Sequence, residues 1–207
     1  MRTAVLASGS GTILEAILDE DIDVVLVVVD RPCRATSVAA LAGVEAVLVE
    51  RSSFGPDFDR RAYTHRVVDV LAERGVELVA MAGFGTVLDE PIHDAYPRRI
   101  LNTHPALLPA FPGWHAVEQA LEVGVKVTGC TVHLATLEVD AGPILAQQAV
   151  PVLPGDSVDR LHERIKETER MLYPRTIREF IQAQGTVSAS VGDRPGRVRR
   201  SAGEERR

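Results

Sequence analysis

The sequence has little of several features that would have indicated other classes of protein. Its 207 residues include only two cysteines, Cys33 and Cys130, with no metal-ligand spacing, which argues against a disulfide scaffold or a metal site and suits a reducing cytoplasm. The longest apolar run, near Val24–Val29, is far shorter than the roughly 20 residues that cross a bilayer, and we find no secretory signal at the N-terminus. The formal net charge is −6, so neither nucleic acid nor an anionic membrane is an expected partner.

What is present is a composition typical of a globular protein, arranged as short apolar runs between amphipathic stretches. The apolar runs predict buried strands at Ala4–Ala7, Val24–Val29, Ala46–Val49, Leu78–Ala82 and Ile100–Asn102. The amphipathic stretches predict helices at Thr12–Asp19, Thr36–Ala42, Phe58–Arg74 and Asp89–Ala95. This alternation predicts an α/β fold with a mostly parallel central sheet and helices on both faces.

The second half of the chain follows a different pattern. It predicts a helix at His115–Glu122, strands at Lys126–Leu134 and Pro143–Val152, and a long helix from Val158. Because proline lacks a backbone N–H, Pro174 should kink or end that helix.

The chain is long enough for one sizeable core, and we expect one domain over residues 1–183. Residues 184–207 would then form a C-terminal extension. From about residue 192 this extension is arginine-rich and nearly free of apolar residues, a composition typical of disorder.

A glycine turn follows the first predicted strand, in the stretch VLASGSGTIL. Glycine permits backbone angles that other residues avoid, so we expect the amides of Gly11, Thr12 and Ile13 at a helix N-terminus, where they can hold a phosphate. Two alternatives stay open: a tight turn that binds nothing, and a dinucleotide site in which Asp30 binds a ribose. The second alternative lacks the third glycine of its fingerprint, because Leu14 stands there.

Two polar residues, Asn102 and His104, interrupt the apolar run ILNTHPALLP. Residues two apart in an extended segment project to one side, so both should face the crevice beyond the carboxyl end of the strand. An amide and an imidazole N–H at one place suit a carbonyl oxygen that becomes negatively charged, and His104 can also protonate a leaving group. Asp140, in the stretch VDAGPIL, is a candidate for tuning that histidine. The alternative is structural: a histidine that caps a strand, and a turn aspartate.

Together, these motifs resemble those of a known family. The stretches VLASGSGTIL, MAGFGTVL, LNTHPALLPAFPG, KVTGCTVHL, EVDAGPIL and RIKETERMLYP resemble the folate-dependent formyltransferases from residue 3 to about 182, and the glycine turn points to the phosphoribosylglycinamide formyltransferases. The resemblance implies a Rossmann-like formyltransferase fold and small-molecule substrates. The co-substrate would be 10-formyltetrahydrofolate, whose formyl group passes to the amine of 5'-phosphoribosylglycinamide, with no metal. Some members form homodimers, so a homodimer is compatible with the resemblance.

The resemblance also implies roles for individual residues. Asn102 and His104 match the pair that holds the oxyanion, His104 matches the general acid, and Asp140 matches the carboxylate that tunes it and orders water. The matching substrate positions are Gly11, Thr12 and Ile13 for the phosphate and Glu169 for the ribose hydroxyls. The matching folate positions are Arg60, Gly85, Thr86, Val87 and Leu88, together with Asn102 and Asp140.

Two departures from the family pattern lie at these positions. Ile13 replaces a usual asparagine, and Gly85-Thr86 replaces a usual Met-Arg pair, so we expect weaker or altered folate binding. The alternatives are a formyltetrahydrofolate hydrolase and a catalytically weakened folate- or nucleotide-binding homologue. Other residues are expected away from the chemistry: His65, His93 and His162 at solvated helix positions, His133 in the core, and Trp114 as a surface anchor.

Overall fold

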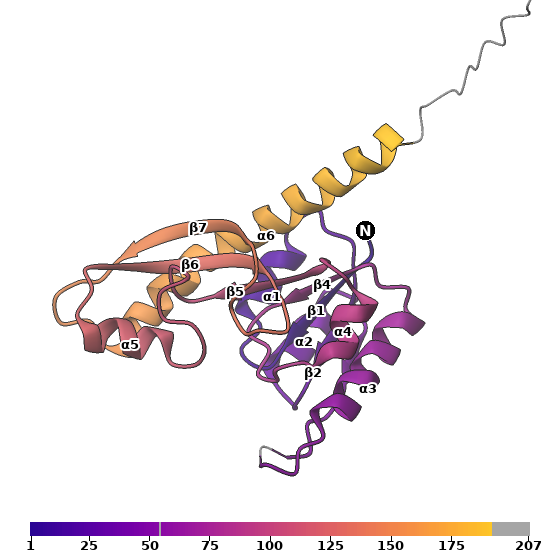
Figure 1. Cartoon of the computed structure of the whole chain (residues 1–207), viewed down its shortest axis with the longest axis horizontal. Helices are drawn as coiled ribbons and strands as arrows, with labels where there is room; N and C mark the ends of the chain where they lie inside the picture. The colour runs from indigo at the N-terminus through magenta and orange to yellow at the C-terminus, as the bar shows by residue number, and fades with distance from the viewer. Residues whose placement is uncertain (54, 192–207) are drawn as a thin grey trace, which may run out of the picture.

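The protein has a central sheet of seven strands in the order β3-β2-β1-β4-β5-β6-β7 (Figure 1), seen in a computed structural model that describes residues 1–53 and 55–191. The strands are β1 Thr3–Ala7, β2 Val24–Val29, β3 Ala46–Leu48, β4 Leu78–Met81, β5 Ile100–His104, β6 Val127–Leu134 and β7 Ile144–Pro151. Strands β1 to β5 pair in parallel, whereas the β5–β6 and β6–β7 pairs are antiparallel. The predicted α/β class with a mostly parallel sheet is confirmed.

Helices cover both faces of this sheet, as predicted. They are α1 Thr12–Leu18, α2 Arg34–Leu41, α3 Arg60–Glu73, α4 Glu90–Ala95, α5 Ala116–Val123 and α6 Val158–Val191. On β1, Val5 and Ala7 belong to the core shared with α1, α2 and α6, whereas Ala4 and Leu6 belong to the core shared with α3 and α4. Adjacent strand residues point to opposite faces, so a sheet covered on both sides needs strands that are apolar throughout.

Pro174 lies inside α6, so the helix does not end there, and the alternative that the proline kinks it stays a prediction. A proline in a helix interior removes one backbone hydrogen bond and costs roughly 3 kcal/mol. Tertiary contacts offset this: burial of Ile177 contributes about 1.5–3 kcal/mol. The buried Tyr173 also donates a 2.8 Å hydrogen bond from its hydroxyl to the carbonyl oxygen of Leu101. Packing against the sheet thus holds the helix through the proline.

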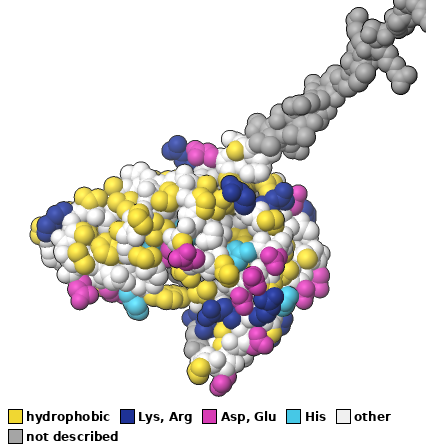
Figure 2. All heavy atoms as spheres, viewed as in Figure 1, with side chains coloured by type: hydrophobic (Ala, Val, Ile, Leu, Met, Phe, Trp, Pro, Cys, Tyr) yellow, Lys and Arg dark blue, Asp and Glu magenta, His cyan; other side chains and the backbone are white. Residues whose placement is uncertain are grey.

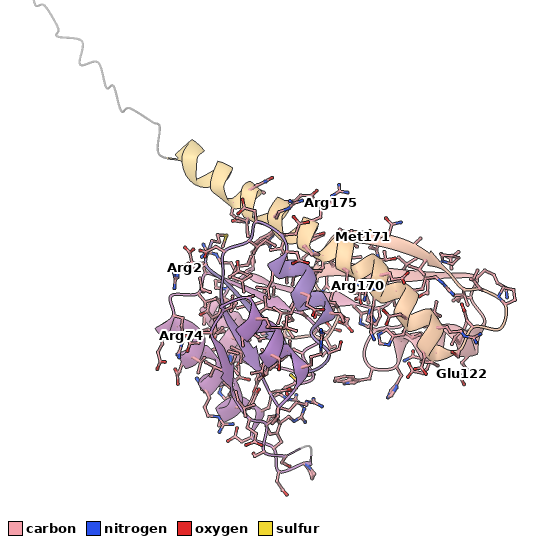
Figure 3. All side chains as sticks on the ribbon, turned by 180° about the vertical axis from the view of Figure 1, so that it is seen from behind. Arg2, Arg74, Glu122, Arg170, Met171 and Arg175 are labelled. Atoms are coloured by element: carbon pink, nitrogen blue, oxygen red, sulfur yellow. The ribbon has the colours of Figure 1, made fainter. Side chains whose placement is uncertain are left out.

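Helix α6 is one long element that crosses the molecule. Its inner side packs on α1, α5, β5, β6 and β7, while Arg170, Met171 and Arg175 point outward in Figure 3. The helix passes the domain boundary expected at residue 183, and that boundary stays a prediction. The disorder predicted from about residue 192 lies outside the described residues. Within the part of the chain that the structure describes, no helix is long and apolar enough to span a membrane.

Candidate active site

A cavity of about 520 Å³ opens where the parallel strands β1, β4 and β5 end. The carboxyl ends of parallel strands share one edge, and open α/β sheets bind ligands there. The cavity wall combines the turn after β1, the strip after β4, the end of β5, the segments 113–118 and 133–140, and α6. It therefore includes most of the residues singled out from the sequence: Gly11, Thr12, Ile13, Gly85, Thr86, Val87, Leu88, Asn102, His104, Asp140 and Glu169.

His104 ends β5, is buried, and has both ring nitrogens in contact with acceptors. Its Nε2 lies 2.8 Å from the backbone oxygen of Phe111, and this nitrogen carries a proton because a carbonyl oxygen only accepts. Its Nδ1 lies 3.3 Å from Oδ2 of Asp140. Both contacts are hydrogen bonds at once only in the doubly protonated ring, which is the form that a general acid needs.

Asp140 is held by backbone groups as well as by histidines. Its φ of 58° lies in the left-handed region, and the backbone N–H of Gly113 donates a 2.7 Å hydrogen bond to its Oδ2. Gly142 lets this loop approach β6 so closely that a Cβ there would overlap the strand's backbone. Burial would raise the pKa of Asp140, but hydrogen bonds from His133 and Gly113, with the nearby imidazoles, hold it below its ordinary value. The carboxylate is therefore charged at neutral pH.

Asn102 is oriented by His133, whose ring is buried. Nδ1 of His133 lies 3.0 Å from the backbone oxygen of Leu134, so Nδ1 carries the proton in the neutral ring and Nε2 is free to accept. Nε2 lies 3.2 Å from Nδ2 of Asn102, which turns the amide nitrogen toward this histidine. Nε2 also lies 3.4 Å from Oδ1 of Asp140, and this contact becomes a hydrogen bond only when Nε2 carries a proton as well as Nδ1. His133 therefore connects Asn102 and Asp140 rather than only filling the core.

The turn after β1 presents backbone amides to the cavity. Gly11 has a φ of 73°, and a side chain there would press on Ala35 of α2. Helix α1 begins at Thr12, and the first amides of a helix have no partner within it. Among the described residues, none supplies a side-chain cap to this helix. The amides of Thr12 and Ile13 can therefore bind an anion.

Glu169 projects from α6 into the same cavity and is buried. Its Oε1 accepts a 2.8 Å hydrogen bond from the hydroxyl of Thr103. Burial raises the pKa of Glu169 to about 7 in spite of that hydrogen bond, so the carboxyl group titrates near neutral pH. Lys166, three residues earlier, also lines the cavity and was missed by the sequence reasoning. Its spacing from Glu169 was the available signal, because residues three apart share a helix face.

The predicted folate positions divide between two adjoining cavities. The strip from Gly85 to Leu88 lines the main cavity, whereas Arg60 lines a second cavity of about 430 Å³. Asp30, considered above as a ribose ligand, is buried and accepts a 2.8 Å hydrogen bond from the hydroxyl of Thr86. Because Thr86 and Arg31 already engage this carboxylate, Asp30 is a poor candidate to bind a ribose, and the dinucleotide alternative is disfavoured.

Two histidines expected at solvated positions lie at the main cavity instead. His93 and His162 are half-buried on its wall, and burial lowers the pKa of each. The prediction was wrong because helical periodicity shows which residues share a face, not whether that face meets a cavity. His65 is exposed, as predicted. Trp114 is 66% exposed, yet it lines both cavities.

The chain is similar to known proteins over most of its length. A family model described as "Formyl transferase" matches residues 1–177. The sequence is 48% identical to a phosphoribosylglycinamide formyltransferase of Mycobacterium tuberculosis over 83% of this chain and 80% of that protein. It is 35% identical to one of Bacillus subtilis over 87% of this chain and 94% of that protein. Its structure is similar to glycinamide ribonucleotide transformylase 1 from Symbiobacterium toebii, with a TM-score of 0.84, 45% identity and 88% of each chain covered.

Proposed function

The chain belongs to the formyl transferase family, and from this premise we propose that it transfers the formyl group of 10-formyltetrahydrofolate to the amine of 5'-phosphoribosylglycinamide in de novo purine biosynthesis. One observation carries the proposal. A single cavity contains both the anion-binding turn at Gly11–Ile13 and the polar cluster of Asn102, His104 and Asp140. These two halves fit a phosphorylated acceptor and a carbonyl group that becomes tetrahedral.

The acceptor is proposed to lie between the turn and α6. The amides of Gly11, Thr12 and Ile13 bind its phosphate, and the ammonium group of Lys166 adds attraction from the opposite wall. Glu169 receives hydrogen bonds from the ribose hydroxyls. Because backbone amides bind the phosphate, isoleucine in place of the family's usual asparagine at position 13 removes a side chain but leaves the amide contact.

The chemical step is direct attack of the acceptor's amine on the formyl carbon. A carbon–nitrogen bond forms, negative charge builds on the formyl oxygen, and the bond between the formyl carbon and N10 of the folate then breaks. Asn102 and His104 supply N–H groups for that oxygen, with Nε2 of His104 exchanging the backbone oxygen of Phe111 for the substrate while Nδ1 stays on Asp140. His104 then gives N10 its proton. The amine loses a proton to water that Asp140 orders. The water and the charge of Asp140 together restore the protonated form of His104.

The donor's pterin is proposed to lie along the strip from Gly85 to Leu88. This strip offers backbone N–H and C=O groups, so recognition of the pterin does not depend on the methionine and arginine that other members carry. Asn102 and Asp140 meet the pterin's N10 end, next to the reacting carbon.

The test is identification of the product by mass spectrometry after incubation with a donor whose formyl carbon is isotopically labelled. The proposal expects the label in formylated phosphoribosylglycinamide. Label found only in free formate, at the same rate with or without acceptor, would instead identify a hydrolase.

A further inference from the structure

A buried carboxylate, that of Asp30, lies against the strip Gly85–Leu88 and has no part in the proposed chemistry. Asp30 directly follows β2 and is 1% exposed. A buried carboxylate is costly unless its oxygens accept hydrogen bonds. Nε of Arg31 lies 3.1 Å from Oδ1, and the hydroxyl of Thr86 donates a 2.8 Å hydrogen bond to Oδ2. The contact with Arg31 is local, whereas the contact with Thr86 joins Asp30 to the segment after β4.

Ser8 makes a second connection between Asp30 and the strip. Its Oγ accepts a hydrogen bond from the backbone N–H of Gly85. Its hydroxyl hydrogen is donated to Asp30, because a carboxylate oxygen only accepts. Ser8 directly follows β1, and β2, β1 and β4 are neighbours in that order. Ser8, Asp30 and Thr86 therefore form a carboxylate bridge across the ends of three adjacent strands.

Gly85 lets the strip lie close to this carboxylate bridge. A Cβ there would lie 3.3 Å from Oγ of Ser8 and 3.4 Å from Oδ2 of Asp30, and it would overlap Nη2 of Arg31. The pair Gly85-Thr86, a departure from the family pattern, thus has a structural consequence. Glycine brings the backbone to the bridge, and the threonine hydroxyl ties the backbone to it.

The carboxylate at the centre of the bridge is charged at neutral pH. Burial would raise the pKa of Asp30, but hydrogen bonds from Arg31, Ser8 and Thr86 hold it below its ordinary value. A hydrogen bond to a charged acceptor is stronger than one between neutral groups. The bridge therefore holds the hydroxyl groups of Ser8 and Thr86 firmly in place.

We propose that Asp30 is a positioning residue for the donor: through Ser8 and Thr86 it fixes the strip Gly85–Leu88 in the conformation that binds the pterin. This rests on the proposed function, which places the pterin along the strip. Neither Ser8 nor Asp30 is among the described residues that line the main cavity, so both act through the strip and not on the ligand. A strip that is ordered in advance binds more tightly, because ordering it on binding would cost affinity.

The first test is Thr86→Val, which removes the hydroxyl group and keeps the size of the side chain. The KM for 10-formyltetrahydrofolate should rise about tenfold, as for loss of a hydrogen bond to a charged group, while kcat and the acceptor KM stay within about twofold. Thr86→Ser restores the hydroxyl group and should return the donor KM to near the wild-type value. Thr176→Val is the matched control, because Thr176 is also buried but its hydroxyl donates to the backbone oxygen of Leu172 within α6.

The other two members of the bridge are tested by Ser8→Ala and Asp30→Asn. Each should raise the donor KM. Asp30→Asn combined with Thr86→Val should raise it no further than the larger single change, because both changes break the same bridge. The melting temperature of each variant is measured alongside. A purely structural role would lower the melting temperature and leave the donor KM unchanged, which would overturn the proposal.

The outcomes separate this proposal from the proposed function. An unchanged donor KM in Thr86→Val, or a Thr86→Ser variant as impaired as Thr86→Val, would overturn it while formyl transfer stands. No turnover by the wild type would contradict the proposed function instead. Fluorescence of Trp114, the single tryptophan and part of the main cavity's wall, would then compare tetrahydrofolate binding by the wild type and Thr86→Val. Weaker binding by Thr86→Val would support the positioning role, and equal binding, or none by either protein, would overturn it.

Discussion

The two sides of the main cavity present different kinds of chemical group. The side built on β1 and β4 offers mainly backbone, at the turn Gly11–Ile13 and the strip Gly85–Leu88. The side built on β5 and β6 offers side chains, among them His104 and His133, which both contact Asp140. By the family resemblance, Ile13 and Gly85-Thr86 on the first side depart from the usual pattern, whereas Asn102, His104 and Asp140 on the second side match it. A backbone site tolerates substitutions that an interlocked side-chain site does not.

The contrast has an energetic basis. A backbone amide stays in place when its own side chain changes, provided that the local conformation is kept. In the side-chain cluster, removal of one member leaves a buried partner without its hydrogen bond, which costs about 1–3 kcal/mol. The outer surface also differs between the two parts of the molecule. Figure 2 shows hydrophobic side chains spread over the part that contains β6 and β7, and most of the charged side chains on the part that contains β1 to β4.

The largest effect is expected from His104→Ala. Loss of a proton donor and charge-stabilising group should lower kcat by about 10²–10³, with little change in the KM for either substrate. Steady-state kinetics measure this, and His65→Ala, at an exposed position of α3, is the control. A wild-type kcat in His104→Ala would show that the cluster is not where the chemistry occurs.

Asp140→Asn should lower kcat by about 10², because it keeps the shape of the side chain and removes the charge beside His104. The pKa of Asp140 is held below its ordinary value, so its contribution is present above that value and is lost as the pH falls through the lowered pKa. The wild-type kcat should therefore not lose the contribution of Asp140 until the solution is clearly acidic. An Asp140→Asn variant with the same pH profile and rate as the wild type would contradict this role.

At the glycine turn, a new negative charge should raise the KM for the acceptor more than the loss of the threonine hydroxyl does. Thr12→Asp places a carboxylate against the expected phosphate and should raise the KM for phosphoribosylglycinamide about tenfold or more. Thr12→Asn has a similar size and no charge, and it should stay near the wild type. If both variants bind the acceptor equally well, the phosphate lies elsewhere.

Glu169 projects from α6 into the main cavity. Its carboxyl group should make the free energy of unfolding depend on pH. Its pKa is raised to about 7, so the stability from its buried neutral form is complete below the ordinary glutamate pKa and is lost as the pH rises to about 7. Glu169→Gln should remove this component. Urea unfolding across that range, compared between the wild type and Glu169→Gln, measures it. Parallel curves for the two proteins would exclude such a shift.

The smallest effect is expected from Ile13→Asn, which introduces the asparagine that the family resemblance implies at this position. Because the amide and not the side chain is proposed to bind the phosphate, the KM for the acceptor should change by no more than about threefold, below the usual effect of one hydrogen bond to a charged group. Measurement of the acceptor KM tests this. A much larger gain in affinity for the acceptor would mean that an asparagine side chain at position 13 contributes to phosphate binding and that the wild-type isoleucine weakens it.

The sequence predicted the sheet and the positions of the turn and the Asn102–His104 pair, because apolar runs and glycine turns are local signals. It did not predict that α6 continues through Pro174, since the packing of Tyr173 and Ile177 is a tertiary effect. It also gave no sign that the backbone oxygen of Phe111 would contact the ring of His104, because a carbonyl group has no residue-specific signature.

Contacts between distant residues were missed for the same reason. The hydrogen bond between Asp30 and Thr86 joins residues 56 positions apart, which lie after β2 and after β4 in the same sheet. His133 was assigned to the core because strand alternation shows that a residue is buried, not which polar groups surround it.

The most direct test of the account is the loss of 10-formyltetrahydrofolate, followed by absorbance with and without phosphoribosylglycinamide. The account predicts loss only when the nucleotide is present, because the backbone side must hold the acceptor before the side-chain cluster can act on the donor. Equal loss without the nucleotide, or no loss in either case, would contradict it.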